Sequence, residues 1–138
     1  MAKKRNDWSF LLLSLGLILL ILAGTYFFNS LPVASKEIDV KFIIGENYGI
    51  DLNRSALTFG KIIPGGDITR YAEIKNDYNF PVRVRVFLSK NIEGFIRVDS
   101  GFVLGAGENI SLPFNAYAPA DASEGNYTGK ARIVLYRK

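Results

Sequence analysis

Two patterns of hydrophobic residues divide the chain. Residues 8–28 (WSFLLLSLGLILLILAGTYFF) form an unbroken apolar run without a charged side chain. A helix rises about 1.5 Å per residue, so a run of this length spans roughly 30 Å, the thickness of a hydrocarbon core. From residue 37 onward, apolar side chains instead recur at every second position, between turns rich in Gly, Pro and Asn. The two patterns predict one transmembrane helix followed by a domain of β-strands.

The charges that flank the apolar run predict its orientation. Three basic residues, Lys3, Lys4 and Arg5, precede the run, whereas Lys36 alone lies near its other end. The positive-inside rule therefore places residues 1–7 in the cytoplasm, as a basic tail, and the part of the chain after the run outside. We interpret the run as a signal anchor, which makes the chain a single-pass protein of the cell membrane.

A cleaved signal peptide is the alternative to an uncleaved anchor, because cleavage positions exist after Gly24 and near residues 33–35. The apolar core of a signal peptide is usually about 7–15 residues long, which favours the anchor here. Pro32 ends any helical continuation, so residues 29–36 (NSLPVASK) are predicted to form a short linker. Both alternatives place residues 37–138, the predicted β domain, on the same outer side.

The outer domain is predicted to be all-β, because apolar and polar residues alternate and no helical periodicity is present. The clearest alternation is VRVRVFL at residues 82–88. A parallel sheet needs crossover helices and none is available, so we expect antiparallel pairing. About seven short strands in roughly 100 residues indicate an immunoglobulin-like β-sandwich. The predicted strands are residues 37–44, 56–63, 67–75, 82–88, 95–104 with an interruption at Ser100-Gly101, 109–116 and 127–136.

Several short motifs of this domain resemble one superfamily of sandwiches. They are LTFGKIIPGG at residues 57–66, IKN at 74–76, PVRV at 81–84, FIRV at 95–98, LGAGE at 104–108 (with Ala106 where proline is usual) and EGNYTG at 124–129. Together they resemble the PapD-like group, which includes the major-sperm-protein and ASH-type domains. The resemblance covers roughly residues 50–138. It implies an immunoglobulin-like fold and little about function, because such domains host many roles.

Two residues of these motifs are expected to hold turns. Asn76 ends a predicted strand, and its side chain can hydrogen-bond the neighbouring backbone. Tyr127 stands at the start of the last strand and resembles a tyrosine corner, whose hydroxyl anchors a crossover loop. We interpret both residues as structural.

The composition argues against catalysis, cofactors and nucleic acid. There is no cysteine and no histidine, so the commonest general base, the commonest metal ligand and all thiolate sites are missing. Carboxylates are scattered, without a calcium loop, a phosphate loop or a paired acid-base motif. A net charge of +4, with part of the excess in the N-terminal tail, is too small to indicate nucleic acid. We expect a non-enzymatic protein with no catalytic residue, no cofactor and no metal.

Three sequons, at Asn53, Asn109 and Asn126, are candidate N-glycosylation sites if the outer location and the host machinery both hold. Chance is the alternative, since Asn, Ser and Thr are common in turns.

A second candidate feature is a basic face. Arg83 and Arg85 share one side of their predicted strand with Phe87, and Lys130 and Arg132 share one side of the last strand. If the two strands pair, these four basic residues form a stripe that suits an acidic partner, anionic headgroups or a polysaccharide. An ordinary solvated sheet face is the simpler alternative.

The resulting hypothesis is a membrane-anchored protein that mediates protein-protein interaction or structural support in the cell envelope. One anchor with one sandwich also resembles small archaeal envelope proteins, such as archaellum stator subunits, and this layout implies an envelope or surface-layer protein as partner. An exposed aromatic patch involving Tyr48, Phe87 or Tyr117 would fit this role. The alternative is a filament or pilus subunit, a homo-oligomer joined by the apolar helix or by exchange of residues 37–44 as a detachable edge strand. A soluble two-domain chaperone fits less well.

Overall fold

The computed structural model describes residues 7–45 and 57–138, and the chain divides into two compact units, Met1–Leu31 and Pro32–Lys138. The first unit contains helix α1, Asp7–Ser30. Its side chains from Trp8 to Ser30 are all exposed, and by length and composition it is apolar enough to cross a membrane. A helix that is apolar on every side belongs in a membrane or in the interior of an assembly.

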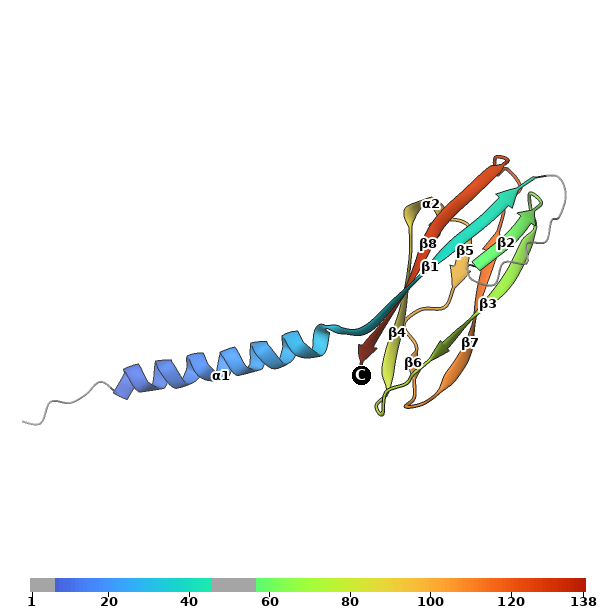
Figure 1. Cartoon of the computed structure of the whole chain (residues 1–138). Helices are drawn as coiled ribbons and strands as arrows, with labels where there is room; N and C mark the ends of the chain where they lie inside the picture. Colours follow the sequence, from blue (N-terminus) through green and yellow to red (C-terminus); the bar gives the residue numbers. More distant parts are fainter. Residues whose placement is uncertain (1–6, 46–56) are drawn as a thin grey trace, which may run out of the picture. The chain divides into compact units, whose positions relative to one another are not determined.

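The second unit consists, in its described part, of two sheets and one helical turn (Figure 1). Sheet A has five strands in the order β2-β1-β8-β4-β6, and sheet B has three in the order β3-β7-β5. Sheet A contains β1 (Pro32–Ile44), β2 (Leu57–Ile62), β4 (Val82–Leu88), β6 (Val103–Leu104) and β8 (Gly125–Arg137); sheet B contains β3 (Asp67–Lys75), β5 (Ile96–Val98) and β7 (Asn109–Tyr117); α2 is Lys90–Glu93.

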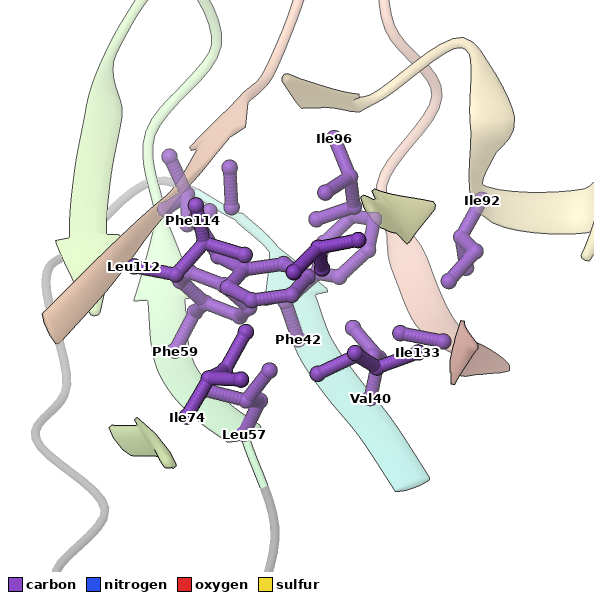
Figure 2. Close-up of a cluster of buried hydrophobic side chains, with 14 of the residues drawn as sticks. Val40, Phe42, Leu57, Phe59, Ile74, Ile92, Ile96, Leu112, Phe114 and Ile133 are labelled. Atoms are coloured by element: carbon purple, nitrogen blue, oxygen red, sulfur yellow. The ribbon is translucent and has the colours of Figure 1, made fainter. Parts of the chain in front are cut away.

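The core lies between the two sheets. Alternate residues of each strand face inward, which is why the period of two in the sequence is visible as burial. In β4, for example, Val82 and Val84 are fully buried while Arg83 and Arg85 are exposed. Figure 2 shows the aromatic centre of this core, where side chains from both sheets meet. Buried core residues include Val40, Phe42, Leu57, Phe59, Ile74, Val82, Val84, Ile96, Leu112, Phe114 and Ile133.

The prediction of a two-sheet β domain after an apolar N-terminal helix is confirmed. β3 and β4 have the predicted bounds, and β7 and β8 extend only slightly beyond theirs. The start of β1 differs more. It begins at Pro32 rather than at residue 37, and Pro32 pairs with Tyr136 of β8. The predicted linker is therefore largely strand, because β8 is long enough to pair with it.

The segment 95–104 is not one strand. β5 belongs to sheet B, where it pairs with β7, whereas β6 belongs to sheet A, where it pairs with β4. Gly101 lies between them with a φ of 88°, a backbone conformation that favours glycine. The predicted interruption is thus a change of sheet. The helical turn α2 was also not predicted, since one turn is too short to show a period.

The pairing of β1 with β2 is parallel, contrary to the expectation of an antiparallel domain. The ladder uses only residues 40–44 of β1, a length of roughly 16 Å. Residues 45–56, which join the two strands, can reach roughly 40 Å when extended, so no crossover helix is needed.

Residues 40–44 of β1 lie between β2 and β8, whereas residues 37–39 pair with β8 alone among the described residues. The hypothesis of a detachable edge strand is therefore wrong for residues 40–44.

Asn76 and Tyr127 hold turns as predicted. The amide nitrogen of buried Asn76 donates to the carbonyls of Phe80, Leu104 and Gly105 at 2.9, 3.3 and 2.8 Å. The hydroxyl of Tyr127 donates to the carbonyl of Ser123 at 2.8 Å, in the loop that crosses from sheet B to sheet A.

Candidate interaction face

The four predicted basic residues lie on one side of sheet A. β4 and β8 pair with Arg83 opposite Tyr136, Arg85 opposite Val134 and Phe87 opposite Arg132. Residues that face each other in a ladder project to the same side of the sheet. We call Arg83, Arg85, Lys130 and Arg132 on this outer side the basic face.

β1 neutralises the β8 half of the basic face. Glu37 lies opposite Arg132, and its carboxylate is 2.5 Å from Lys130 Nζ and 3.6 Å from Arg132 Nη2. The hydrogen bond and the charge of Lys130 lower the pKa of Glu37, and Glu37 in turn raises the pKa of Lys130. Asp39, opposite Lys130, adds a second negative charge. The stripe is therefore less basic than its arginines and lysines alone suggest.

The β4 half keeps its charge. Among the described residues, no carboxylate lies within ion-pair distance of Arg83 or Arg85. The guanidinium of Arg85 lies over the ring of Tyr136, 5.7 Å from its centroid. Phe87, two residues along β4, is 49% exposed. Val134 faces the same outer side but is only 5% exposed, because Arg85 and Ser35 flank it in the ladders.

Arg85, Phe87, Val134 and Tyr136 together form what we call the Arg85 patch. It combines an unpaired cation, an exposed aromatic ring and a buried apolar floor. Arginine and aromatic residues are the side chains that interfaces concentrate relative to the rest of a surface. Of the surfaces that the described residues form, this one best matches the predicted interaction role.

The predicted aromatic patch is not a single surface. Phe87 belongs to the outer side of sheet A, whereas Tyr117 belongs to β7 of sheet B, where the guanidinium of Arg97 lies 5.0 Å from the centroid of its ring. Tyr48 lies outside the described residues. Phe87 therefore lies with the basic face and not with Tyr117.

The two described sequons lie on exposed strand positions. Asn109 is the first residue of β7 and pairs with Lys75, and Asn126 is near the start of β8 and pairs with Ile43. Asn53 lies outside the described residues. Both asparagines are exposed in the folded domain. Their use as acceptors stays a prediction.

The described part of the chain contains no cluster of candidate metal ligands. No group of three or more acidic residues lies close enough there to hold a metal ion. An open cleft of about 620 Å³ is lined by residues of β3, β4, α2, β5 and β7. Within this lining, Asn115 donates to Thr69 at 3.0 Å.

Sequence reasoning missed two features of this domain. The hydroxyl of Tyr78 donates to the carbonyl of Val33 at 2.9 Å and so fixes the start of β1. Glu37 was not predicted to neutralise Lys130 and Arg132, because the neighbour of a strand is a tertiary property. The sequence signal for this neutralisation is that acidic residues alternate in EIDVK (37–41) with the same period as the basic residues in KAR (130–132), which form ion pairs if the two strands are neighbours.

Comparison with protein-family models, with curated proteins and with solved structures finds no match to this chain.

Proposed function

We propose that the chain is a membrane-anchored, extracytoplasmic protein whose immunoglobulin-like, PapD-like domain binds a protein of the cell envelope without catalysing a reaction. The observation that carries the proposal is the contrast between the two units. α1 has no buried side chain between Trp8 and Ser30, whereas the second unit completes its own core. A helix of this kind is an anchor, and the domain is what it displays.

The Arg85 patch is the surface we assign to the envelope partner. Its unpaired guanidinium favours a carboxylate, and its aromatic rings favour an apolar or aromatic side chain next to that carboxylate. The partner is therefore a protein with an exposed acidic and apolar surface. A surface-layer protein of the same envelope fits this chemistry.

The filament alternative has no specific observation in its favour. Its strand-exchange form requires a detachable edge, and residues 40–44 of β1 are paired on both sides. Its helix-core form requires that α1 pack against copies of itself, which the same apolar surface would allow.

Site-specific photo-crosslinking of the full-length chain in native membranes tests the partner. A photo-crosslinking phenylalanine derivative replaces Phe87 in one variant and Tyr71 in the control, since Tyr71 is 64% exposed on the other sheet. We expect one dominant envelope protein at position 87 and none at position 71, with the yield reduced by Arg85→Glu. A ladder of self-crosslinks at position 87 would instead support the filament alternative and overturn ours.

The outer location is tested by labelling a single cysteine. The chain contains no cysteine, so Asp121→Cys provides a unique thiol on an exposed turn. A membrane-impermeant maleimide should label it in intact cells. Labelling only after lysis would place the domain in the cytoplasm and overturn the proposed topology.

A further inference from the structure

The end of the two-sheet domain at which β1 begins is joined by a set of hydrogen bonds. Pro32 pairs with Tyr136, the amide of Lys138 donates to Pro81 at 3.2 Å, and Tyr78 donates to Val33. We call this end the proximal end. It comprises Pro32 and Val33, loops 76–81 and 105–108, and residues 136–138.

The proximal end carries an excess of unpaired positive charge. Of its two side-chain carboxylates, Asp77 lies 2.5 Å from Lys75, and Glu108 accepts a hydrogen bond from the amide of Gly105 at 2.6 Å. No carboxylate among the described residues pairs with Arg137 or Lys138, the basic side chains of this end, or with Arg83, which lies opposite Tyr136 in β4.

Aromatic residues accompany these charges. The guanidinium of Arg137 lies 4.4 Å from the centroid of the Phe80 ring, and Phe80 stacks on Tyr78 with the two centroids 5.1 Å apart. Rings of this kind, next to basic side chains, are typical of the level at which membrane proteins meet lipid headgroups.

The opposite end of the domain, which we call the distal end, has the opposite charge balance. It comprises turn 63–66, α2 and loop 118–124, and the amide of Gly65 donates to Ala118 at 2.8 Å there. Its described residues and their immediate neighbours provide more carboxylates than lysines. They are Asp67, Glu93, Asp121 and Glu124 against Lys61 and Lys90. The domain is thus polarised along its strands.

The chain itself sets which end is near the membrane. α1 ends at Ser30 and β1 begins at Pro32, so the two Cα atoms are no more than about 7 Å apart. The headgroup layer on each side of a bilayer is roughly 5–8 Å thick. If α1 crosses a membrane, Pro32, the first residue of the proximal end, lies at or just outside that layer.

We propose that the proximal end binds the anionic headgroups of the membrane that α1 crosses, with Arg137 and Lys138 on lipid phosphates and Arg83 beside them. This inference rests on the proposed anchoring of α1. Basic side chains within a Debye length of an anionic surface are attracted to it, and the acidic distal end is repelled. The bound end then limits how freely the displayed domain tumbles.

Fluorescence quenching in vesicles tests the inference on the full-length chain. One variant carries a fluorophore at Asn79→Cys in the proximal end, and the control carries it at Asp121→Cys in the distal end. Vesicles of phosphatidylcholine, with or without phosphatidylglycerol, contain a lipid with a quencher on its headgroup. Trp8 is the only tryptophan, so its quenching by brominated acyl chains reports insertion of α1 in the same samples.

We expect quenching at position 79 to exceed that at position 121 and to rise about twofold or more with phosphatidylglycerol. The double variant Arg137→Glu with Lys138→Glu should abolish the rise in quenching with phosphatidylglycerol. Lys138→Glu alone should reduce this rise. Lys90→Glu, which makes the same change of charge at the distal end, should leave the rise in quenching unchanged.

Equal quenching of the two labels while Trp8 is quenched would overturn the headgroup contact and leave the anchor intact. An unquenched Trp8 would overturn the anchor and the contact together.

Discussion

The proximal and distal ends of the domain are stabilised by different interactions. At the proximal end one buried side chain, that of Asn76, joins the two loops 76–81 and 105–108. Its side-chain nitrogen donates to three carbonyls, and its side-chain oxygen accepts a hydrogen bond from the main-chain amide of Tyr78 at 3.1 Å. The main-chain amide of Asn76 also donates to the carbonyl of Glu108 at 2.9 Å. The distal end depends instead on apolar packing. Ile92 of α2 is fully buried over Gly129, and the rings of Phe42 and Tyr127 stack 5.2 Å apart.

The difference has a physical consequence. A hydrogen-bond network centred on one amide has no substitute for that amide, since its removal leaves several buried carbonyls without a donor. Apolar contacts are shared among many atoms, so the distal end is sensitive to volume and shape instead. Substitutions that are equally small in chemistry should therefore act differently at the two ends.

Asn76→Ala should have the largest effect. It removes all four side-chain hydrogen bonds and leaves the carbonyls of Phe80, Leu104 and Gly105 short of a donor, which should lower the free energy of unfolding by about 3 kcal/mol. Urea unfolding of the full-length chain in detergent, followed by near-ultraviolet circular dichroism, measures it. Asn79→Ala, an exposed amide in the same loop, is the control and should change little. Equal effects of the two would show that the network is not what holds this end.

Gly129→Ala tests packing at the distal end. A Cβ at position 129 would lie 2.8 Å from both Cγ atoms of Ile92 and would overlap Ser89 Oγ. Overpacking of this kind should cost about 2 kcal/mol of unfolding free energy, measured in the same way. Gly94→Ala is the matched control, because Gly94 has a φ of −74° and open space around its Cα. An unchanged free energy of unfolding for Gly129→Ala would mean that α2 shifts away from β8 without loss of stability.

Two tyrosine substitutions compare the contribution of a single hydrogen bond to stability at the two ends. Tyr78→Phe and Tyr127→Phe each delete one hydroxyl that donates to a main-chain carbonyl. The carbonyl of Val33 is partly buried, whereas that of Ser123 is exposed and water can replace the lost donor. We expect a loss of about 1.5 kcal/mol for Tyr78→Phe and about 0.5 kcal/mol for Tyr127→Phe. The reverse order would show that the tyrosine corner matters more than the tie between Tyr78 and β1.

Local sequence patterns predict where the strands lie along the chain, but they do not predict which strands pair with one another in a sheet. The alternation at residues 82–88 and 67–75 determines both strand bounds and burial, because each depends on one strand alone. The start of β1 was missed because residues 32–36 contain a proline and small residues, and only pairing with β8 makes them a strand. The change of sheet between β5 and β6 and the parallel pairing of β2 likewise depend on which strands meet.

The candidate site shows the same limit. That Arg83 and Arg85 share a side follows from the period of two, and the pairing of β4 with β8 extends that side as hypothesised. The charge of the face does not follow, since it depends on Glu37 of β1. The Arg85 patch could not be separated from Lys130 and Arg132 until the order of strands was known.

Glu37→Gln should have the smallest effect on stability, because both partners are exposed and water screens their attraction. Its pH dependence is still diagnostic. Folding lowers the pKa of Glu37, so any stabilisation is present above the pKa of an unfolded glutamate and is lost as the pH falls through the folded value. The difference between wild type and Glu37→Gln in urea should therefore exist at neutral pH, vanish in acid and shrink with salt. A difference that persists in acid would assign the role of Glu37 to packing, and the basic face would then be weakly neutralised and free to bind along its whole length.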